Sequence, residues 1–183
     1  LAILDPFIIS QAPKNIIYQS SLASLMRSIE TFVTKDSNEI TKYFSKISFN
    51  LLVKSLTKNK LNIGDYENLQ WGCIFSMFAL SNSSSGPCGV INYFLSSNYK
   101  ISQPLSYCFS AIEFIKFNID KKYYYYGDIL GKKLNSKINS FKLLKLLNQI
   151  QNNIKKEILE TKSNLSSQKD IEIKIFNVFK SIN

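Results

Sequence analysis

The sequence predicts a mainly α-helical protein that forms one bundle-like domain over residues 1–183. The first observation behind this prediction is that apolar residues recur with the period of an amphipathic helix in several long segments. The second is that no two segments combine the alternating pattern of strands with a hairpin turn. The third is that the chain has no internal repeat or linker, and its 183 residues with 45% hydrophobic content suit a single core.

The first predicted helices follow a short apolar opening. Residues 1–4 are expected to be extended and to enter a turn at Asp5-Pro6, and Pro13 suits the first turn of a helix. Apolar residues at helical spacing then predict helices over 16–33 and 39–56, with Asp36-Ser37-Asn38 as the break and cap between them.

The rest of the chain is also predicted to be helical. A polar, lysine-rich loop is expected over 57–64, followed by a helix over 66–80 that is apolar on most of its surface and is therefore expected to be central. An irregular connection is predicted over 96–104. The further predicted helices cover 88–95, 105–117, 123–130, 141–159 and 169–179.

The chain is strongly basic, since 23 Lys and Arg against 13 Asp and Glu give a net charge of +10. Arg27 is the only arginine, whereas recognition of bases and phosphates depends on the bidentate guanidinium group. Abundant Lys, Asn, Ile and Tyr are typical of a protein from an AT-rich genome, so we interpret the charge as a solvated surface. A basic surface for nucleic acid or for an acidic partner is the alternative.

The cysteine and histidine content limits which disulfide, metal-binding and acid–base functions the chain can have. Cys73, Cys88 and Cys108 have the spacing of neither a disulfide framework nor a CxxC motif. A reducing intracellular compartment (cytoplasm or organelle matrix) is therefore favoured over secretion. The chain has no histidine, so the commonest general base and transition-metal ligand is missing. No apolar run approaches the roughly 20 residues of a membrane span.

Three segments, in order, carry a family resemblance. They are Ala2-Ile3-Leu4-Asp5-Pro6 with the helix that ends Arg27-Ser28-Ile29-Glu30-Thr31-Phe32-Val33, then Phe78-Ala79-Leu80-Ser81-Asn82, and then Tyr99-Lys100-Ile101-Ser102-Gln103-Pro104-Leu105. They resemble the AILDP, GMDALxHAIE, AFSNAGLG and YGIPHG segments in the C-terminal helical domain of the iron-containing (group III) alcohol dehydrogenases, in the dehydroquinate synthase-like superfamily. The resemblance covers nearly the whole chain. It implies that the family's N-terminal nucleotide-binding domain is absent, since the chain begins about where the second domain would.

The resemblance also implies a metal site, which this sequence does not preserve. In the family one Asp and three His hold a divalent iron or zinc ion, and a further His is linked to proton transfer. The positions of the ligands are Ala23, Arg27, Gly89 and Gln103 in this sequence, and the proton-transfer position is Tyr93. Ala and Gly have no side-chain donor, Gln is a poor ligand, and Arg places a fixed positive charge where the ion would lie.

We therefore expect a non-catalytic, degenerate domain without metal or nicotinamide cofactor, which serves as a structural or accessory subunit of a larger protein assembly. On this interpretation Arg27 fills the vacated space and pairs with a nearby carboxylate or carbonyl. One alternative is that the chain forms part of an NAD(P)-dependent alcohol dehydrogenase that is metal-independent or is completed by a partner chain. In that enzyme Arg27 would stabilise an oxyanion and Tyr93 would donate the proton. A second alternative is a basic nucleic-acid-associated module.

Overall fold

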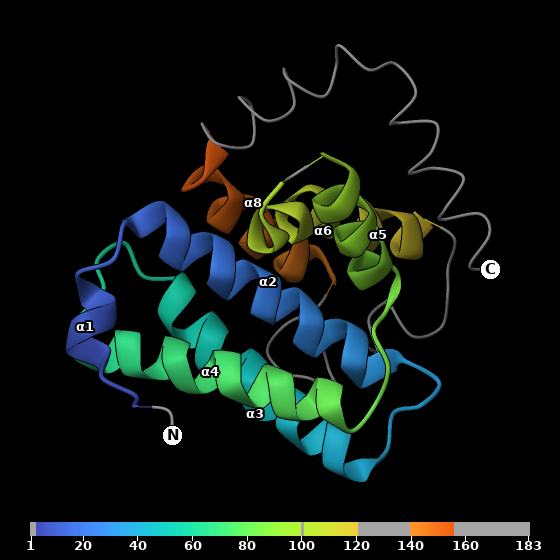
Figure 1. Cartoon of the computed structure of the whole chain (residues 1–183), viewed down its shortest axis with the longest axis horizontal. Coiled ribbons are helices and arrows are strands. Elements are labelled where there is room, and N and C mark those ends of the chain that lie inside the picture. Colours follow the sequence, from blue (N-terminus) through green and yellow to red (C-terminus); the bar gives the residue numbers. More distant parts are fainter. Residues whose placement is uncertain (1–2, 100, 121–139, 156–183) are drawn as a thin grey trace.

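The computed structural model describes residues 3–99, 101–120 and 140–155, and the regular structure in these ranges is entirely α-helical (Figure 1). The helical class predicted from the sequence is therefore confirmed. The helices are α1 (Pro6–Ser10), α2 (Lys14–Val33), α3 (Glu39–Leu56), α4 (Ile63–Ser81), α5 (Pro87–Tyr99), α6 (Gln103–Asp120) and α8 (Ser140–Asn152). Within the described ranges no helix is long and apolar enough to cross a membrane.

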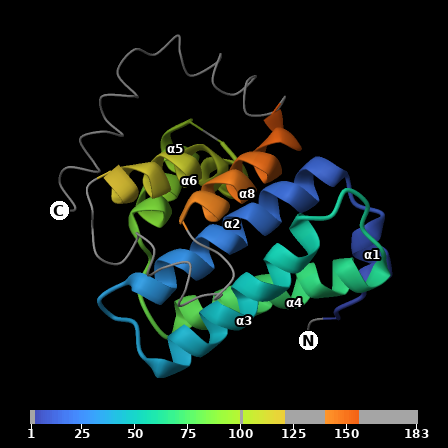
Figure 2. The ribbon, with the colours of Figure 1, turned by 180° about the vertical axis from the view of Figure 1, so that it is seen from behind.

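Helix α2 is the central element of the bundle. It contacts α3 and α4 on one side and α5, α6 and α8 on the other, and it runs between these two groups in both views (Figures 1 and 2). Leu22, Leu25, Met26 and Ile29 of α2 are fully buried, and serines and threonines occupy much of the remaining helix surface. These small side chains let neighbouring helices approach α2 from several directions.

Helices α3 and α4 form a tightly packed hairpin. The hydroxyl of Ser48 donates a hydrogen bond to the backbone oxygen of Gly72 at 2.7 Å, which joins the two helices directly. A Cβ atom added at Gly72 would lie 2.6 Å from Cγ of Leu52. The close approach therefore depends on glycine at this position.

Several helix ends differ from the prediction. Helix α4 begins at Ile63 and not at 66, because Asn62 and Asp65 form a capping box around the first turn. The predicted irregular connection over 96–104 is wrong, because α5 continues to Tyr99 and α6 already begins at Gln103. The predicted turn at Asp5-Pro6 is instead the start of the short helix α1, and Asp5 caps it by accepting a hydrogen bond from the backbone N–H of Phe7.

The expectation that the helix over 66–80 is central is also wrong. Helix α4 lies at the edge of the bundle, in front of α3 in the view of Figure 1. Trp71, Met77 and Phe78 of this helix are each more than 40% exposed. A helix that is apolar all round gives no signal for which side faces the core, so only the packing on α2 and α3 decides it. The helices predicted over 123–130 and 169–179, and the part of 141–159 beyond residue 155, lie outside the described residues.

Candidate functional site

A polar cluster lies where α2, α4, α5 and α6 meet, and Arg27 of α2 is at its centre. The guanidinium donates a hydrogen bond from Nη1 to Oγ of Ser76 on α4 at 3.2 Å. Its Cζ atom lies 5.6 Å from the ring centroid of Tyr107 on α6, within the range of a cation–π interaction. Its Nε is buried and has no hydrogen-bond partner among the described residues. Within the described residues Arg27 thus makes no hydrogen bond to the expected carboxylate or carbonyl, but its charge acts on the carboxyl of Glu30 and lowers the pKa of that group.

Glu30, one turn after Arg27, closes the cluster on the side of α5. Its side chain is 2% exposed, and Oε1 accepts a hydrogen bond from the backbone N–H of Cys88 at 2.6 Å. Because Cys88 is in the first turn of α5, whose N–H groups have no partner within the helix, Glu30 acts as a cap supplied by another helix. The contact fixes the position of α5 against α2.

Two glycines make this approach sterically feasible. A Cβ atom at Gly86 would lie 2.5 Å from Oε1 of Glu30, and one at Gly89 would lie 1.7 Å from Oγ of Ser85 and 3.1 Å from the hydroxyl of Tyr107. A side chain at either position therefore requires the polar groups of the cluster to move. The start of α5 is thus packed against Glu30 and Tyr107 without room for a further donor group.

The electrostatics of the cluster follow from its burial. Burial raises the pKa of Glu30 from its ordinary value of 4.5 to about 7, although hydrogen bonds from the start of α5 and the charge of Arg27 lower it in part. Burial and then the charge of Glu30 raise the pKa of Tyr107, and Arg27 opposes this rise. Burial and Glu30 likewise raise the pKa of the Cys88 thiol. At neutral pH Tyr107 and Cys88 are therefore protonated, so neither is an activated nucleophile.

The structure brings together only some of the residues singled out from the sequence. Ala23 lies one turn before Arg27 on α2 and is buried. Gly89 reaches the same cluster through its closeness to Tyr107. Tyr93 is 58% exposed on α5, and no contact between it and Arg27 is present in the described part of the chain. Gln103 is exposed at the start of α6, one turn before Tyr107.

The sequence interpretation missed three partners of this cluster. Ser76 of α4 and Tyr107 of α6 are distant from Arg27 in the sequence, and no local pattern links them to it, whereas Glu30 lies three residues after Arg27 on α2. One signal was available for Glu30, since it is the one acidic side chain of α2 and lies in the apolar stretch at the end of that helix. A carboxylate in that setting is almost always paired.

The residues at these positions do not fit the divalent ion that the resemblance implies. Ala23 and Gly89 have no side-chain donor, and Arg27 is itself a cation. The carboxylate of Glu30, one turn after Arg27 on α2, already accepts a hydrogen bond from the backbone of α5. Within the described residues, no three or more His, Cys, Asp or Glu side chains are grouped so that they could hold a metal ion.

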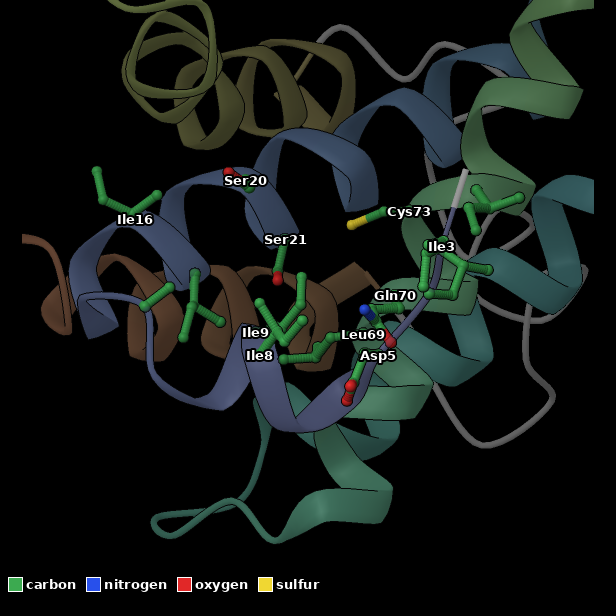
Figure 3. A pocket seen from close by; sticks show the side chains of 14 residues that line it. Ile3, Asp5, Ile8, Ile9, Ile16, Ser20, Ser21, Leu69, Gln70 and Cys73 are labelled. Atoms are coloured by element: carbon green, nitrogen blue, oxygen red, sulfur yellow. The ribbon is translucent and has the colours of Figure 1, made fainter. Parts of the chain in front are cut away.

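A separate cavity of about 410 Å³ lies between the N-terminal segment, α1, α2 and α4 (Figure 3). Its walls are mostly apolar, and they include Ile8 and Ile9 of α1 and Leu69 and Ile74 of α4. No pattern in the sequence predicts this cavity, because it forms where α1 folds back onto α4.

Comparison with solved structures places this fold among known ones. It is similar to the crystal structure of sulfoacetaldehyde reductase from Bifidobacterium kashiwanohense in complex with NAD⁺, with a TM-score of 0.65 and 17% sequence identity. The similarity covers 84% of this chain but 41% of that chain, so this chain spans about two fifths of the reductase. No protein-family model and no curated protein matches the sequence. The likeness therefore establishes a shared helical fold.

Proposed function

We propose that this chain is a non-catalytic helical domain that serves as a structural or accessory subunit of a larger protein assembly. The observation that carries the proposal is the chemistry of the cluster around Arg27. The family resemblance would put a metal ion among Ala23, Arg27, Gly89 and Gln103, and these residues offer one guanidinium and one neutral amide. A bound cation would be repelled by Arg27 at short range, so these four positions would not hold the Lewis acid that polarises a carbonyl group.

The contacts of Arg27 and Glu30 support a structural role for the same place. Arg27 joins α2 to α4 and α6, and Glu30 joins α2 to the start of α5. On this proposal the cluster holds together the helices that a metal ion would link in the family. The helices pack in the family's arrangement although the metal ligands are replaced. This supports a structural role for the fold, since a fold by itself does not determine a function.

The experiment is gentle purification of the native particle that contains this chain, followed by mass spectrometry of its components. Stoichiometric recovery with other proteins is the expected result. Recovery as a small homo-oligomer with nicotinamide cofactor bound would contradict the proposal. The cofactor readout separates the two outcomes even where the particle masses are similar.

A second candidate is part of an NAD(P)-dependent reductase whose chemistry is metal-free. It is favoured by the similarity to a reductase solved with NAD⁺ and by Nε of Arg27, a buried donor without a hydrogen-bond partner in the described residues, since a donor of this kind stabilises a developing oxyanion. Its test is aldehyde reduction with NADH by the native particle and by an Arg27→Ala variant. Equal rates from the two proteins would exclude a role for Arg27.

A further inference from the structure

The guanidinium of Arg27 uses a small part of its hydrogen-bonding capacity within the described residues. Arginine has five N–H donors, and this side chain donates one hydrogen bond there, from Nη1 to Oγ of Ser76 at 3.2 Å. Nε is buried and has no partner among the same residues. In a guanidinium, the N–H of Nε and one N–H of Nη2 point in the same direction from one edge. We call this the free edge of Arg27, because the described part of the chain places no acceptor on it.

The positive charge of Arg27 is also not fully neutralised by the described residues. The ion pairs found in that part of the chain do not include Arg27. The carboxyl of Glu30 feels its charge, but Oε1 of Glu30 accepts the backbone N–H of Cys88 at 2.6 Å. Burial also raises the pKa of Glu30 to about 7, so near neutral pH this carboxyl is charged for only part of the time. Buried or partly buried charges are usually paired, and the guanidinium therefore lacks a full counter-charge.

The polar groups around the guanidinium are already hydrogen-bonded to one another. Ser76 donates its hydroxyl proton to the backbone oxygen of Cys73 at 2.7 Å, and the thiol of Cys73 is hydrogen-bonded to Ser24. The hydroxyl of Tyr107 is hydrogen-bonded to Ser85. Burial raises the pKa of the Cys73 thiol and of the Tyr107 hydroxyl, so both are neutral at physiological pH. These neighbours supply neither the missing acceptor nor the missing negative charge.

The position of the free edge suits a small solute. Arg27 as a whole is half-buried, whereas its Nε is fully covered. The edge therefore lies just below the surface of the domain, where bulk water competes little for the buried donor. A buried polar atom without a partner is often the contact of a bound water or ion, and a donor beside a positive charge selects an anion.

We propose that the free edge of Arg27 binds a small carboxylate anion, at the place where the family resemblance would put a metal cation. The two oxygens of a carboxylate match the two parallel N–H groups of one guanidinium edge. A phosphate group fits less well, because its further oxygens and second charge would meet hydroxyls that are already hydrogen-bonded. The inference goes beyond the proposed function, because it assigns a ligand to the cluster whether or not the chain has protein partners.

The test follows the Nε–H signal of Arg27 by ¹⁵N–¹H NMR while the chain is titrated with sodium acetate. Arg27 is the only arginine, so the spectrum contains one such signal and its assignment is unambiguous. At about pH 6, where carboxylic acids are ionised, the signal should move downfield and saturate, because a charge-assisted hydrogen bond forms at Nε. Acetamide has a similar shape without the charge and should leave the signal in place, as should sodium chloride at the same ionic strength.

Two variants add a second readout, the thermal midpoint of unfolding. Acetate at about ten times its half-saturating concentration should raise the midpoint of the unmodified chain by about 3 °C. Arg27→Lys keeps the positive charge but lacks the planar edge, so its midpoint should rise by about 1 °C or less. Lys46→Met is the matched control, because Lys46 is another cation over an aromatic ring, 5.8 Å from the ring centroid of Phe32. Its removal should leave the acetate effect unchanged.

Three results would overturn the inference. An Nε–H signal that does not move with acetate would show that water or no ligand at all occupies the free edge. Equal shifts with acetate and chloride that do not saturate would indicate ionic screening or an adventitious ion only. A larger shift with phosphate than with acetate at equal ionic strength would assign the edge to a phosphate group. The proposed function would stand in each of these cases, because it is tested by the proteins recovered with the native particle.

Discussion

The stability of this protein should depend on pH through Glu30. Burial raises the pKa of this carboxyl from 4.5 to about 7, so the folded protein retains the proton over a pH range in which the unfolded chain has released it. A raised carboxyl pKa contributes stability that is complete below the unfolded pKa and is lost as the pH rises through the folded pKa. The free energy of unfolding should therefore fall from about pH 4.5 to about pH 7.

The size of this effect follows from the pKa difference. A difference of about 2.5 between the folded and unfolded pKa corresponds to about 3 kcal/mol, at 1.36 kcal/mol for each tenfold change. This is a large fraction of the roughly 5–15 kcal/mol that stabilises a typical domain. The perturbation that isolates it is Glu30→Gln, which keeps the shape and the acceptor oxygen for the N–H of Cys88 but does not titrate.

The assay is urea unfolding followed by circular dichroism, at a series of pH values, for the unmodified chain and the variant. The stability of the unmodified chain relative to Glu30→Gln should decrease by about 2–3 kcal/mol between about pH 5 and pH 8. Glu39→Gln is the control, because Glu39 is exposed and its ion pair with Lys42 lowers its pKa, so its titration lies below this range. Parallel curves for Glu30→Gln and the unmodified chain would refute the buried, titrating carboxyl.

The other predictions concern the packing and the caps. Arg27→Met should shift the pH at which Glu30 loses its stabilising effect to a higher value, since the charge of Arg27 lowers the pKa of Glu30. Arg27→Lys keeps the charge and should leave that pH near its original value. Equal midpoints for Arg27→Met and the unmodified chain in the same urea series would contradict this coupling. Gly72→Ala should lower the free energy of unfolding by about 1–3 kcal/mol, because the new Cβ would overlap Leu52, whereas Gly64→Ala, whose Cβ would meet nothing closer than 3.4 Å, should change it by less than about 0.5 kcal/mol. Asn62→Ala should cost about 1 kcal/mol through loss of the capping box of α4, measured as a lower thermal midpoint; an unchanged midpoint would mean that the cap contributes nothing to the folded state.

The sequence by itself determined the helical class and the position of the most regular helices. The period of apolar residues located α2 and α3 within two residues of their observed bounds, and Asn38 was correctly identified at the cap of α3. These features are local, because helix spacing and capping depend on residues within one or two turns of each other. The lack of histidine and the identities at Ala23, Arg27 and Gly89 were equally fixed by the sequence.

Only the tertiary structure decided what surrounds Arg27 and which apolar side chains face solvent. Glu30 and Cys88 are 58 residues apart, and Arg27 and Ser76 are 49 apart, so no local pattern predicts that they meet. The exposure of Trp71 and Phe78 was hidden for a related reason. When a helix is apolar on nearly all sides, any of its sides can pack against the core. Which side chains of α4 stay exposed is therefore decided only by how α4 packs on α2 and α3.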